Sequence, residues 1–241
     1  MIQEELSDAQ LYRYARHLVL NEIGEEGQLK LLKAKVIVIG AGGLGAPLLM
    51  YLAASGVGYI SIVDHDEIEL SNLQRQIIHS ALSVGKNKAC SAAQSLKALN
   101  PEPKLQVIEQ EINEINAHGL LAQHDLVIDS SDNWETRLVV ARTAEALHIP
   151  LLSGAIYQYD GQISLLRPYK DTPGLEDIFP TGPKEGGGRC EDVGVFAPAC
   201  GIVGSYMASE ALKTLLDIKP SLAGKMLMID CLNLSQHIIE L

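Results

Sequence analysis

The fold is decided by the stretch Lys35–Gly45, which has the sequence KVIVIGAGGLG. Four β-branched residues in succession are typical of a strand that is covered on both faces of a sheet. The glycines that follow have the spacing GxGxxG and precede an apolar segment predicted to be helical to about residue 55. Gly40 permits a tight turn, and Gly45 lets the helix pack close to the strand. Gly42 or Gly43 lets a phosphate or a ribose approach the backbone at the amino end of that helix.

A carboxylate follows at the position where dinucleotide-binding folds contact ribose. Tyr59–Val63 (YISIV) is predicted to be the second strand, and Asp64 ends it, 19 residues after Gly45. The glycine pattern alone is a weak signal. Its strand context and Asp64 together predict a nucleotide site, the alternative being a glycine-rich turn needed only for packing.

Strands and helices alternate along much of the chain. Residues 5–33 are predicted to be helical, as are residues 86–99 and a segment that follows residue 133 and ends at residue 147. Three further strands are predicted at residues 105–108, 125–129 and 150–153. This order predicts an α/β fold with a doubly wound, Rossmann-like, mostly parallel sheet.

The pattern changes after residue 154. Residues 168–194 contain four prolines and six glycines and are predicted to form a long mobile loop. A strand at 162–166, a helix at 201–216 and two closing strands at 226–229 and 237–239 predict an extra C-terminal strand and helix portion. We expect one domain over residues 1–241, with N-terminal helices at 5–33, a nucleotide-binding core at 35–153 and a further portion at 154–241.

Composition excludes several classes of protein. The 241 residues are 47% apolar and 20% charged, which is typical of a globular domain with a substantial core. A net charge of −11 argues against a nucleic-acid partner. No apolar run is long enough to span a bilayer, and the N-terminus lacks the features of a signal peptide, so we expect no membrane association. Four scattered cysteines without a CxxC pair indicate a reducing, cytoplasmic location.

Polar residues are predicted to gather at the carboxyl ends of the strands. Arg75 and Lys88 suit a triphosphate better than a nicotinamide, because their charge offsets that of the phosphates. Asp132 follows the fourth strand and is a candidate ligand of Mg²⁺. Each residue also has an ordinary explanation: a surface ion pair for Arg75, a solvated helix position for Lys88 and a helix N-cap for Asp132.

The stretch from residue 40 to residue 80 resembles the MoeB/ThiF group of ubiquitin-activating-enzyme-like adenylyltransferases. Its run Ser71–Gln76 (SNLQRQ) is highly specific. The similarity extends from the ELSD and RYAR segments near the N-terminus, through SSDN at 130–133 and SGA…GQI at 153–163, to VGVFAP at 193–198. The ELSD opening, Ile78–Ser80 and the SGA…GQI segment favour the MoeB branch, which activates molybdopterin synthase.

The resemblance implies a reaction. ATP adenylylates the C-terminal glycine carboxylate of a small β-grasp, ubiquitin-like sulfur carrier that ends in Gly-Gly, and a sulfur donor protein then supplies the thiocarboxylate. Residues 154–241 are then implied to bind the carrier. The residues placed around the nucleotide are Gly40, Gly42, Gly43, Gly45, Asp64, Ser71, Asn72, Arg75, Lys88, Asp132 and Asn133.

Two further residues are implied to take part. Arg16 matches an arginine that reaches into the neighbouring subunit's site, which implies a homodimer. Cys190 lies where a cysteine can capture the activated carrier tail or its sulfur, the alternative being a loop cysteine without a role. The other cysteines, Cys90, Cys200 and Cys231, are expected to be inert core residues.

One departure from the family concerns zinc. Members typically carry two CxxC pairs that bind structural Zn²⁺. Gly174–Asp177 (GLED) stands where the first pair is expected, and the sequence ends at Leu241, where the second would follow. No structural zinc is therefore expected.

Three alternatives stay open. The first is ThiF-like activation of the thiamine sulfur carrier, or of another carrier or a peptide. The second is an NAD-dependent dehydrogenase, in which Arg75, Lys88 and Asp132 have no role. The third is an inactive scaffold.

Overall fold

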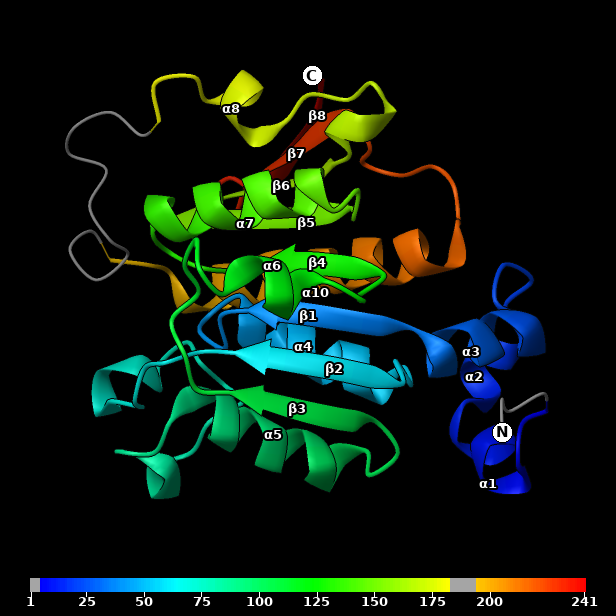
Figure 1. Cartoon of the computed structure of the whole chain (residues 1–241). Coiled ribbons are helices and arrows are strands. Elements are labelled where there is room, and N and C mark those ends of the chain that lie inside the picture. The colour runs from blue at the N-terminus through cyan, green and yellow to red at the C-terminus, as the bar shows by residue number, and fades with distance from the viewer. Residues whose placement is uncertain (1–4, 183–193) are drawn as a thin grey trace.

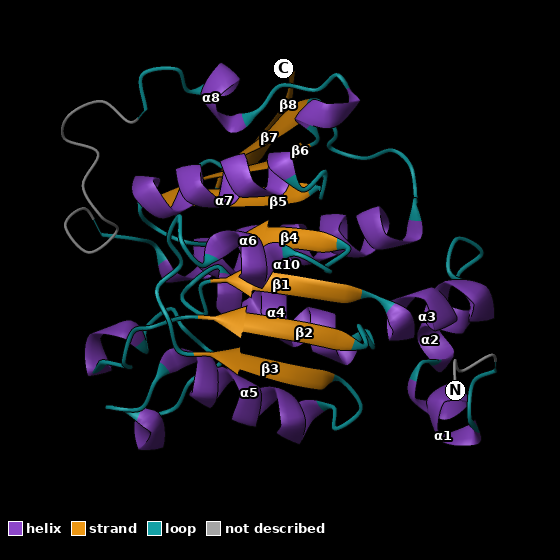
Figure 2. Ribbon diagram, in the orientation of Figure 1, coloured by secondary structure: helices purple, strands orange, loops and turns teal. Residues whose placement is uncertain are grey.

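A computed structural model describes residues 5–182 and 194–241 as one eight-stranded sheet flanked by helices (Figures 1 and 2). The strand order is β3-β2-β1-β4-β5-β6-β7-β8, parallel from β3 to β5 and antiparallel from β5 to β8. The strands are β1 (Lys35–Ile39), β2 (Tyr59–Val63), β3 (Lys104–Ile108), β4 (Leu126–Asp129), β5 (Leu151–Tyr157), β6 (Asp160–Leu166), β7 (Lys225–Asp230) and β8 (Ser235–Glu240). The predicted doubly wound, mostly parallel fold with its C-terminal extension is confirmed.

Helices cover both faces of the parallel strands, so alternate residues of a strand enter different cores. Val36 and Val38 pack in a core with α4, α5 and α10, whereas Ile37 and Ile39 pack in a core with α6 and α7. Burial on both faces is the physical reason for the continuous β-branched run. The helices are α1 (Asp8–Arg13), α2 (Ala15–Leu18), α3 (Gly24–Lys33), α4 (Gly45–Ala54), α5 (Lys88–Leu99), α6 (Ala117–Leu121), α7 (Trp134–Ala146), α8 (Leu175–Ile178) and α10 (Ala197–Leu216), with 3-10 turns η1 (Leu70–Asn72), η2 (Ala81–Ser83) and η3 (Pro168–Lys170).

The strand order creates the place for a ligand. The chain leaves β1 toward β2 and β3 on one side of the sheet, and β4 and β5 lie on the other side. In open parallel sheets a crevice forms at such a reversal, outside the carboxyl ends of the strands. The ends of β1, β2 and β4 meet at this edge, whereas α1, α2 and α3 lie at the opposite end of the sheet (Figure 1).

The segment 5–33 contains three short helices, α1, α2 and α3. Elsewhere the structure differs from the sequence-based expectation in two places. The five-residue helix α6 was not predicted, because it is too short to show helical periodicity. The described part of the expected loop 168–194 contains η3 and α8, and the rest of it, Cys190 included, lies outside the described residues.

The three described cysteines differ in burial. Cys200 and Cys231 are buried, as expected of core residues. Cys90 is only half-buried, so its expected place in the core is wrong. Burial and then the neighbouring Glu109 raise the pKa of the Cys90 thiol, which keeps it protonated and unreactive.

Within the described residues, no helix combines the length and the apolar character needed to cross a membrane.

A half-buried histidine predicts how stability changes with pH. His124 Nε2 lies 2.9 Å from Ser61 Oγ, and its Nδ1 lies 3.1 Å from the carbonyl oxygen of Leu121. Burial lowers the pKa of His124 below its ordinary 6.5, so below that pH the unfolded chain binds a proton that the folded protein excludes. Stability is therefore complete above about pH 6.5 and decreases as the pH falls below it.

We expect thermal unfolding to show a lower Tm as the pH is lowered from about 7 to about 5.5, and a smaller decrease in His124→Gln. An equal decrease in both proteins would show that His124 is not responsible.

Candidate functional site

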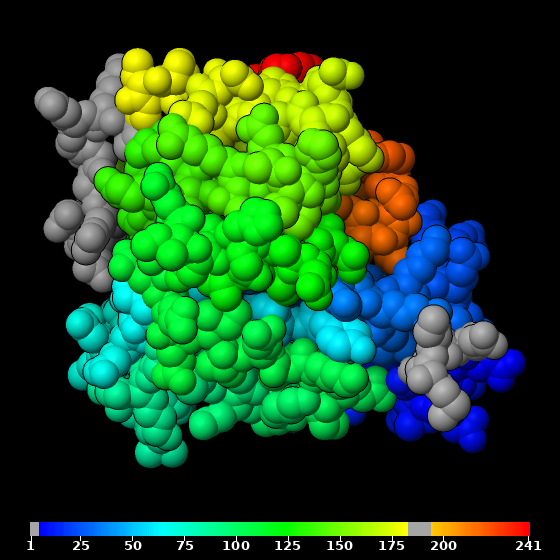
Figure 3. All heavy atoms as spheres, in the orientation of Figure 1, coloured from blue at the N-terminus to red at the C-terminus, as the bar shows by residue number. Residues whose placement is uncertain are grey.

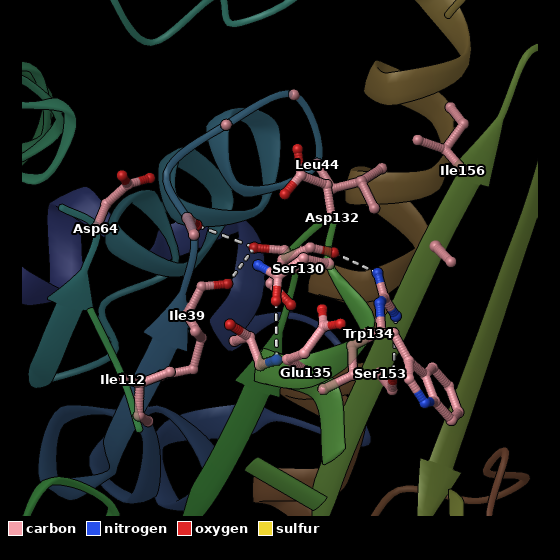
Figure 4. Close-up of a pocket in the computed structure, with 18 of the residues that line it drawn as sticks. Ile39, Leu44, Asp64, Ile112, Ser130, Asp132, Trp134, Glu135, Ser153 and Ile156 are labelled. Carbon is pink, nitrogen blue, oxygen red and sulfur yellow. Dashed lines mark hydrogen bonds between the residues drawn. The ribbon is translucent and has the colours of Figure 1, made fainter. Parts of the chain in front are cut away.

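A cavity of about 510 Å³ opens at the carboxyl ends of β1, β2 and β4. Its walls come from the turn after β1, the segments after β2 and β4, and the start of α10. In Figure 4 the labelled side chains of Asp64, Ser130 and Asp132 surround this opening. The predicted site residues that line it are Gly40, Gly42, Gly43, Asp64, Arg75, Lys88, Asp132 and Asn133.

The turn after β1 requires glycine at two positions. Gly40 has a φ of +96°, a left-handed conformation that favours glycine. A Cβ on Gly45 would overlap the carbonyl oxygen of Gly40, so this glycine is needed for the close approach of helix and strand. Ser130 stabilises the turn, since its Oγ donates to the carbonyl oxygens of Ile39 at 2.8 Å and Gly40 at 2.9 Å. Gly45 does not line the cavity, which agrees with its predicted packing role.

The two central glycines differ in what lies next to them. A Cβ on Gly43 would lie 2.8 Å from Cys200 Sγ, so any side chain there would collide with the start of α10. Above Gly42 the nearest atom is Gln76 Nε2, 3.6 Å from the position of a Cβ. A ligand can therefore lie directly against the backbone at Gly42.

Asp64 is bound to the glycine turn. Its Oδ2 accepts from the Ala41 backbone N–H at 2.7 Å, and its Oδ1 accepts from the Asp66 N–H at 3.0 Å. Burial raises the pKa of Asp64, while the Ala41 N–H and the positive charge of Lys88 act in the opposite direction. The carboxylate is thus positioned beside the turn, where it can accept hydrogen bonds from sugar hydroxyls.

His79 also stabilises this turn. Its Nε2 lies 3.0 Å from the Ala41 carbonyl oxygen, and its Nδ1 lies 3.0 Å from Ser91 Oγ on α5. Burial lowers the pKa of His79, which keeps the ring neutral at pH 7. A neutral imidazole with the proton on Nε2 donates to Ala41 and accepts from Ser91. It ties the glycine turn to α5, the helix that begins with Lys88.

Lys88 is the first residue of α5 and is only 7% exposed. Its Nζ lies 2.8 Å from Asp66 Oδ2. A cation at a helix N-terminus is disfavoured by the helix dipole, and Asp66 offsets that cost. The alternative of a solvated helix residue is therefore wrong, and the structure holds this ammonium group at the cavity wall.

Arg75 lies over the glycine turn. Its Cδ is 3.6 Å from the position of a Cβ on Gly43, and its Nη1 donates to the Ser71 carbonyl oxygen at 3.3 Å. Among residues 5–182 and 194–241 it forms no ion pair, so the alternative of a surface ion pair is wrong. Its charge stays available to an anionic ligand.

Asp132 and Asn133 have different roles, a candidate metal ligand and a helix N-cap, which the sequence alone could not assign. Asn133 is the N-cap of α7, because its Oδ1 accepts from the Thr136 N–H at 2.8 Å. The N-cap alternative for Asp132 is therefore wrong. The Asp132 side chain is exposed at the cavity and makes no hydrogen bond or ion pair with the part of the chain that the structure describes. A carboxylate in this state suits Mg²⁺, which binds through one or two carboxylates and the phosphates of its substrate.

A second set of possible metal ligands lies across the cavity. The ligand atoms of Asp64, His65 and Asp66 are within 4.8 Å of one another. Asp66 is already paired with Lys88 and Asp64 with the Ala41 N–H, so these groups are less free than Asp132.

Ser71 and Asn72 do not line the cavity. Ser71 Oγ donates to Glu69 Oε2 at 3.0 Å, and Asn72 Oδ1 accepts from the Glu69 N–H at 3.0 Å. The Asn72 carbonyl oxygen accepts from the N–H groups of Arg75 at 3.1 Å and Gln76 at 3.0 Å. In this structure the two residues shape the turn that presents Arg75.

Arg16 is not brought to the cavity of its own chain. It is exposed on α2, beside α1, at the opposite end of the sheet (Figure 1). The neighbouring Tyr14 hydroxyl donates to Glu102 Oε2 at 2.8 Å, just before β3 begins. Figure 3 shows the same separation: the N-terminal residues (blue) lie on one side of the molecule and the cyan segment near residue 75 on the other.

Sequence reasoning did not identify Arg137, which organises the site. Arg137, on the second turn of α7, donates to the carbonyl oxygens of Ser131 and Gly154, the latter at 2.9 Å, and lies 3.7 Å from the buried carboxylate of Asp129. It joins the ends of β4 and β5 and fixes the segment that carries Asp132. The sequence feature that could have identified Arg137 is its position four residues after Asn133, which places the two residues on the same face of the helix.

The segment where the family places its first cysteine pair is part of α8. The Gly174 N–H donates to Asp177 Oδ2 at 2.8 Å, and Leu175 is buried. Arg142 on α7 donates to both oxygens of Glu176, at 2.7 and 2.9 Å. Hydrogen bonds and an ion pair thus attach this short helix to α7.

The chain matches the ThiF family over residues 14–241. A SAMP-activating enzyme E1 of Haloferax volcanii is 42% identical over 95% of this chain and 85% of that protein. A sulfur carrier protein adenylyltransferase of Thermus thermophilus is 42% identical over 94% of this chain and 85% of that protein. Across these and further curated relatives, the chain spans from 48% to 85% of their length.

The fold has a close counterpart among solved structures. E. coli MccB with ATP superimposes with a TM-score of 0.82 over 99% of this chain and 74% of that chain, at 24% identity, a likeness that shows the fold alone. The relative from Thermus thermophilus is named an adenylyltransferase and is 42% identical over 94% of this chain. At this level of identity the enzyme class is shared, and this chain is an adenylyltransferase. The family match includes the glycine turn and every residue of the cavity, and the chain belongs to the ThiF family.

Proposed function

We propose that the chain transfers AMP from ATP to the C-terminal glycine carboxylate of a small β-grasp, ubiquitin-like sulfur carrier that ends in Gly-Gly. One observation carries the proposal: a single cavity gathers a glycine turn, a carboxylate beside that turn, two cations and a second carboxylate that pairs with no described residue. The names of the relatives, a SAMP-activating enzyme and a sulfur carrier protein adenylyltransferase, support this substrate class.

The reaction needs positioning and charge neutralisation rather than a strong base. A carboxylate oxygen of the carrier attacks the α-phosphorus, the bond from that phosphorus to the bridging oxygen breaks, and pyrophosphate leaves. The attacking carboxylate is already ionised at pH 7, so no proton has to be removed. Catalysis then consists of holding the two reactants in line and opposing the charge on the phosphates.

We assign the residues that line the cavity to positioning of the nucleotide or to neutralisation of its charge. Asp64 accepts hydrogen bonds from the ribose hydroxyls, and the backbone of Gly42 and Gly43 lies against the nucleotide. Arg75 and Lys88 oppose the charge on the phosphates. Asp132 would hold Mg²⁺, which would supply further positive charge near the phosphates. Asn133 fixes the start of α7 beside it.

We assign carrier binding to the portion 154–241. The cavity continues to residues of β5, β6 and β7. The same portion of the chain carries exposed apolar side chains of the kind enriched at protein interfaces, namely Tyr157, Tyr159, Phe196, Ile202, Tyr206, Leu232 and Leu234. The rings of Tyr159 and Phe196 pack at a centroid distance of 5.3 Å, which presents them as one surface. Such a surface fits a folded carrier whose tail enters the cavity.

The carrier of molybdopterin synthase, its small subunit, is the first candidate, on the grounds of the MoeB-like segments. A ThiF-like role with the thiamine carrier, or with another carrier or a peptide, is the alternative. A sulfur donor protein would then convert the acyl-adenylate to a thiocarboxylate, and Cys190 is the proposed site of transient capture. We further propose a cytoplasmic homodimer in which each chain forms a single domain over residues 1–241.

The test is a pyrophosphate-exchange assay with ATP and each candidate carrier. Exchange with one Gly-Gly-ending carrier and none with its tail-truncated form is the expected result. Absence of exchange with every such carrier would favour the inactive scaffold.

Nucleotide choice gives a second prediction. ATP with Mg²⁺ at about 100 times its Kd should raise the free energy of unfolding by about 2.7 kcal/mol, whereas NAD should have no effect. Thermal unfolding with each ligand measures this difference. A shift with NAD and none with Mg·ATP would instead support a dehydrogenase.

A further inference from the structure

Gln76 is a buried side chain at the wall of the cavity, and no described residue forms a hydrogen bond with its amide. It is 4% exposed, and its Oε1 is enclosed with no partner in the part of the chain that the structure describes. Its Nε2 likewise has no hydrogen bond to any residue that the structure describes. The backbone on both sides is fixed, because the Gln76 N–H donates to the Asn72 carbonyl at 3.0 Å and the His79 N–H donates to the Gln76 carbonyl at 3.1 Å.

An unpaired buried carboxamide destabilises a fold. Methionine has nearly the same length and volume and would fill the same space without an unsatisfied polar atom. Packing therefore does not explain an amide at this position. The contrast within the chain is Gln28, which is 0% exposed but fully engaged, donating to the Ser55 carbonyl at 3.0 Å and lying 3.1 Å from His17 Nδ1.

The amide faces the glycine turn. Gln76 Nε2 lies 3.6 Å from the position of a Cβ on Gly42, and nothing else lies within 4 Å of that position. Arg75, the preceding residue, lies over Gly43 in the same way. The –NH₂ group is a donor only, so what it can bind above Gly42 is an acceptor.

We propose that Gln76 is a further substrate-binding residue, whose Nε2 donates a hydrogen bond to a phosphate oxygen of the ATP that lies over Gly42. Phosphate is the acceptor that this position favours, because Arg75 places a positive charge over the neighbouring Gly43 and the glycine turn admits an oxygen next to the backbone. The neutral amide gives direction to the phosphate without adding charge. This inference rests on the proposed use of ATP.

The experiment compares Gln76→Met, Gln76→Glu and the matched control Gln28→Met. For Gln76→Met we expect a Tm equal to or above that of the wild type, with kcat/KM for ATP in pyrophosphate exchange lowered about 10- to 100-fold. Gln76→Glu should lower kcat/KM further, because a carboxylate repels the phosphates. Gln28→Met should do the reverse, with a lower Tm and an unchanged KM for ATP.

Direct binding of Mg·ATP, measured by calorimetry, separates the two proposals. Weaker binding in Gln76→Met supports the inference even if no carrier supports turnover, in which case only the proposed function fails. Equal binding and equal kcat/KM in Gln76→Met and the wild type would overturn the inference and leave the function standing. A fall in Tm in Gln76→Met as large as in Gln28→Met would show that the amide is structural and would also overturn it.

Discussion

Replacing Asp132 with asparagine is expected to lower the rate of carrier adenylylation at least about 100-fold, while Tm changes by no more than a few degrees. The side chain is exposed at the cavity and makes no hydrogen bond or ion pair within the described part of the chain. Its loss therefore costs the fold little. An amide of the same shape removes the charge that would hold Mg²⁺ beside the phosphates.

The measurement is pyrophosphate release with ATP and the carrier, over a range of Mg²⁺ concentrations. The matched control is Glu145→Gln, an exposed carboxylate farther along α7 that does not line the cavity. We expect the control to retain the wild-type rate. Wild-type rates in Asp132→Asn at every Mg²⁺ concentration would exclude Asp132 as a metal ligand.

Replacing Arg16 with alanine is expected to lower adenylylation about 10³-fold, the size of effect that an arginine supplied from a neighbouring subunit has in phosphoryl transfer. Within one chain Arg16 lies at the end of the sheet opposite the cavity (Figure 1), so an effect on catalysis requires a second copy. Its side chain is exposed, so the fold should tolerate the change. Arg13→Ala is the control, since Arg13 is exposed nearby and donates to the Leu99 carbonyl at 3.5 Å.

Mixing the two inactive variants tests whether Arg16 acts across a dimer. In a mixed dimer of Arg16→Ala and Asp132→Asn, one site has an intact Asp132 and receives an intact Arg16 from the partner. The other site lacks both groups. Random exchange of subunits should thus restore about one quarter of the wild-type activity. If mass spectrometry detects mixed dimers and no activity returns, Arg16 does not act in trans.

Local sequence patterns were sufficient to predict the part of the site formed by β1, the glycine turn and Asp64. The β-branched run of β1, the GxGxxG turn and Asp64 after β2 are properties of short segments, and a parallel strand buried on both faces admits few other patterns. The alternation of strands and helices then places the carboxyl ends of β1, β2 and β4 at one edge. The cavity gathers eight of the residues chosen from the sequence for this reason.

Local patterns could not assign different roles to adjacent residues of similar type. Asp132 and Asn133 are both good N-caps, and only the path of the chain into α7 decides that Asn133 takes the cap and leaves Asp132 free. Periodicity likewise placed Lys88 on a helix without showing that it pairs with Asp66, a residue 22 positions earlier. Short helices such as α6 carry too few residues to show a period.

The sequence by itself determined the doubly wound sheet, the glycine turn and the class of ligand, because these depend on the order and spacing of residue types along short segments. The tertiary structure alone decided which side chains lie against that turn. Gln76 faces Gly42 and Arg137 joins the ends of β4 and β5 only because the folded sheet brings distant segments together. Whether a buried polar group is satisfied or left free depends on those distant partners, which no local pattern encodes.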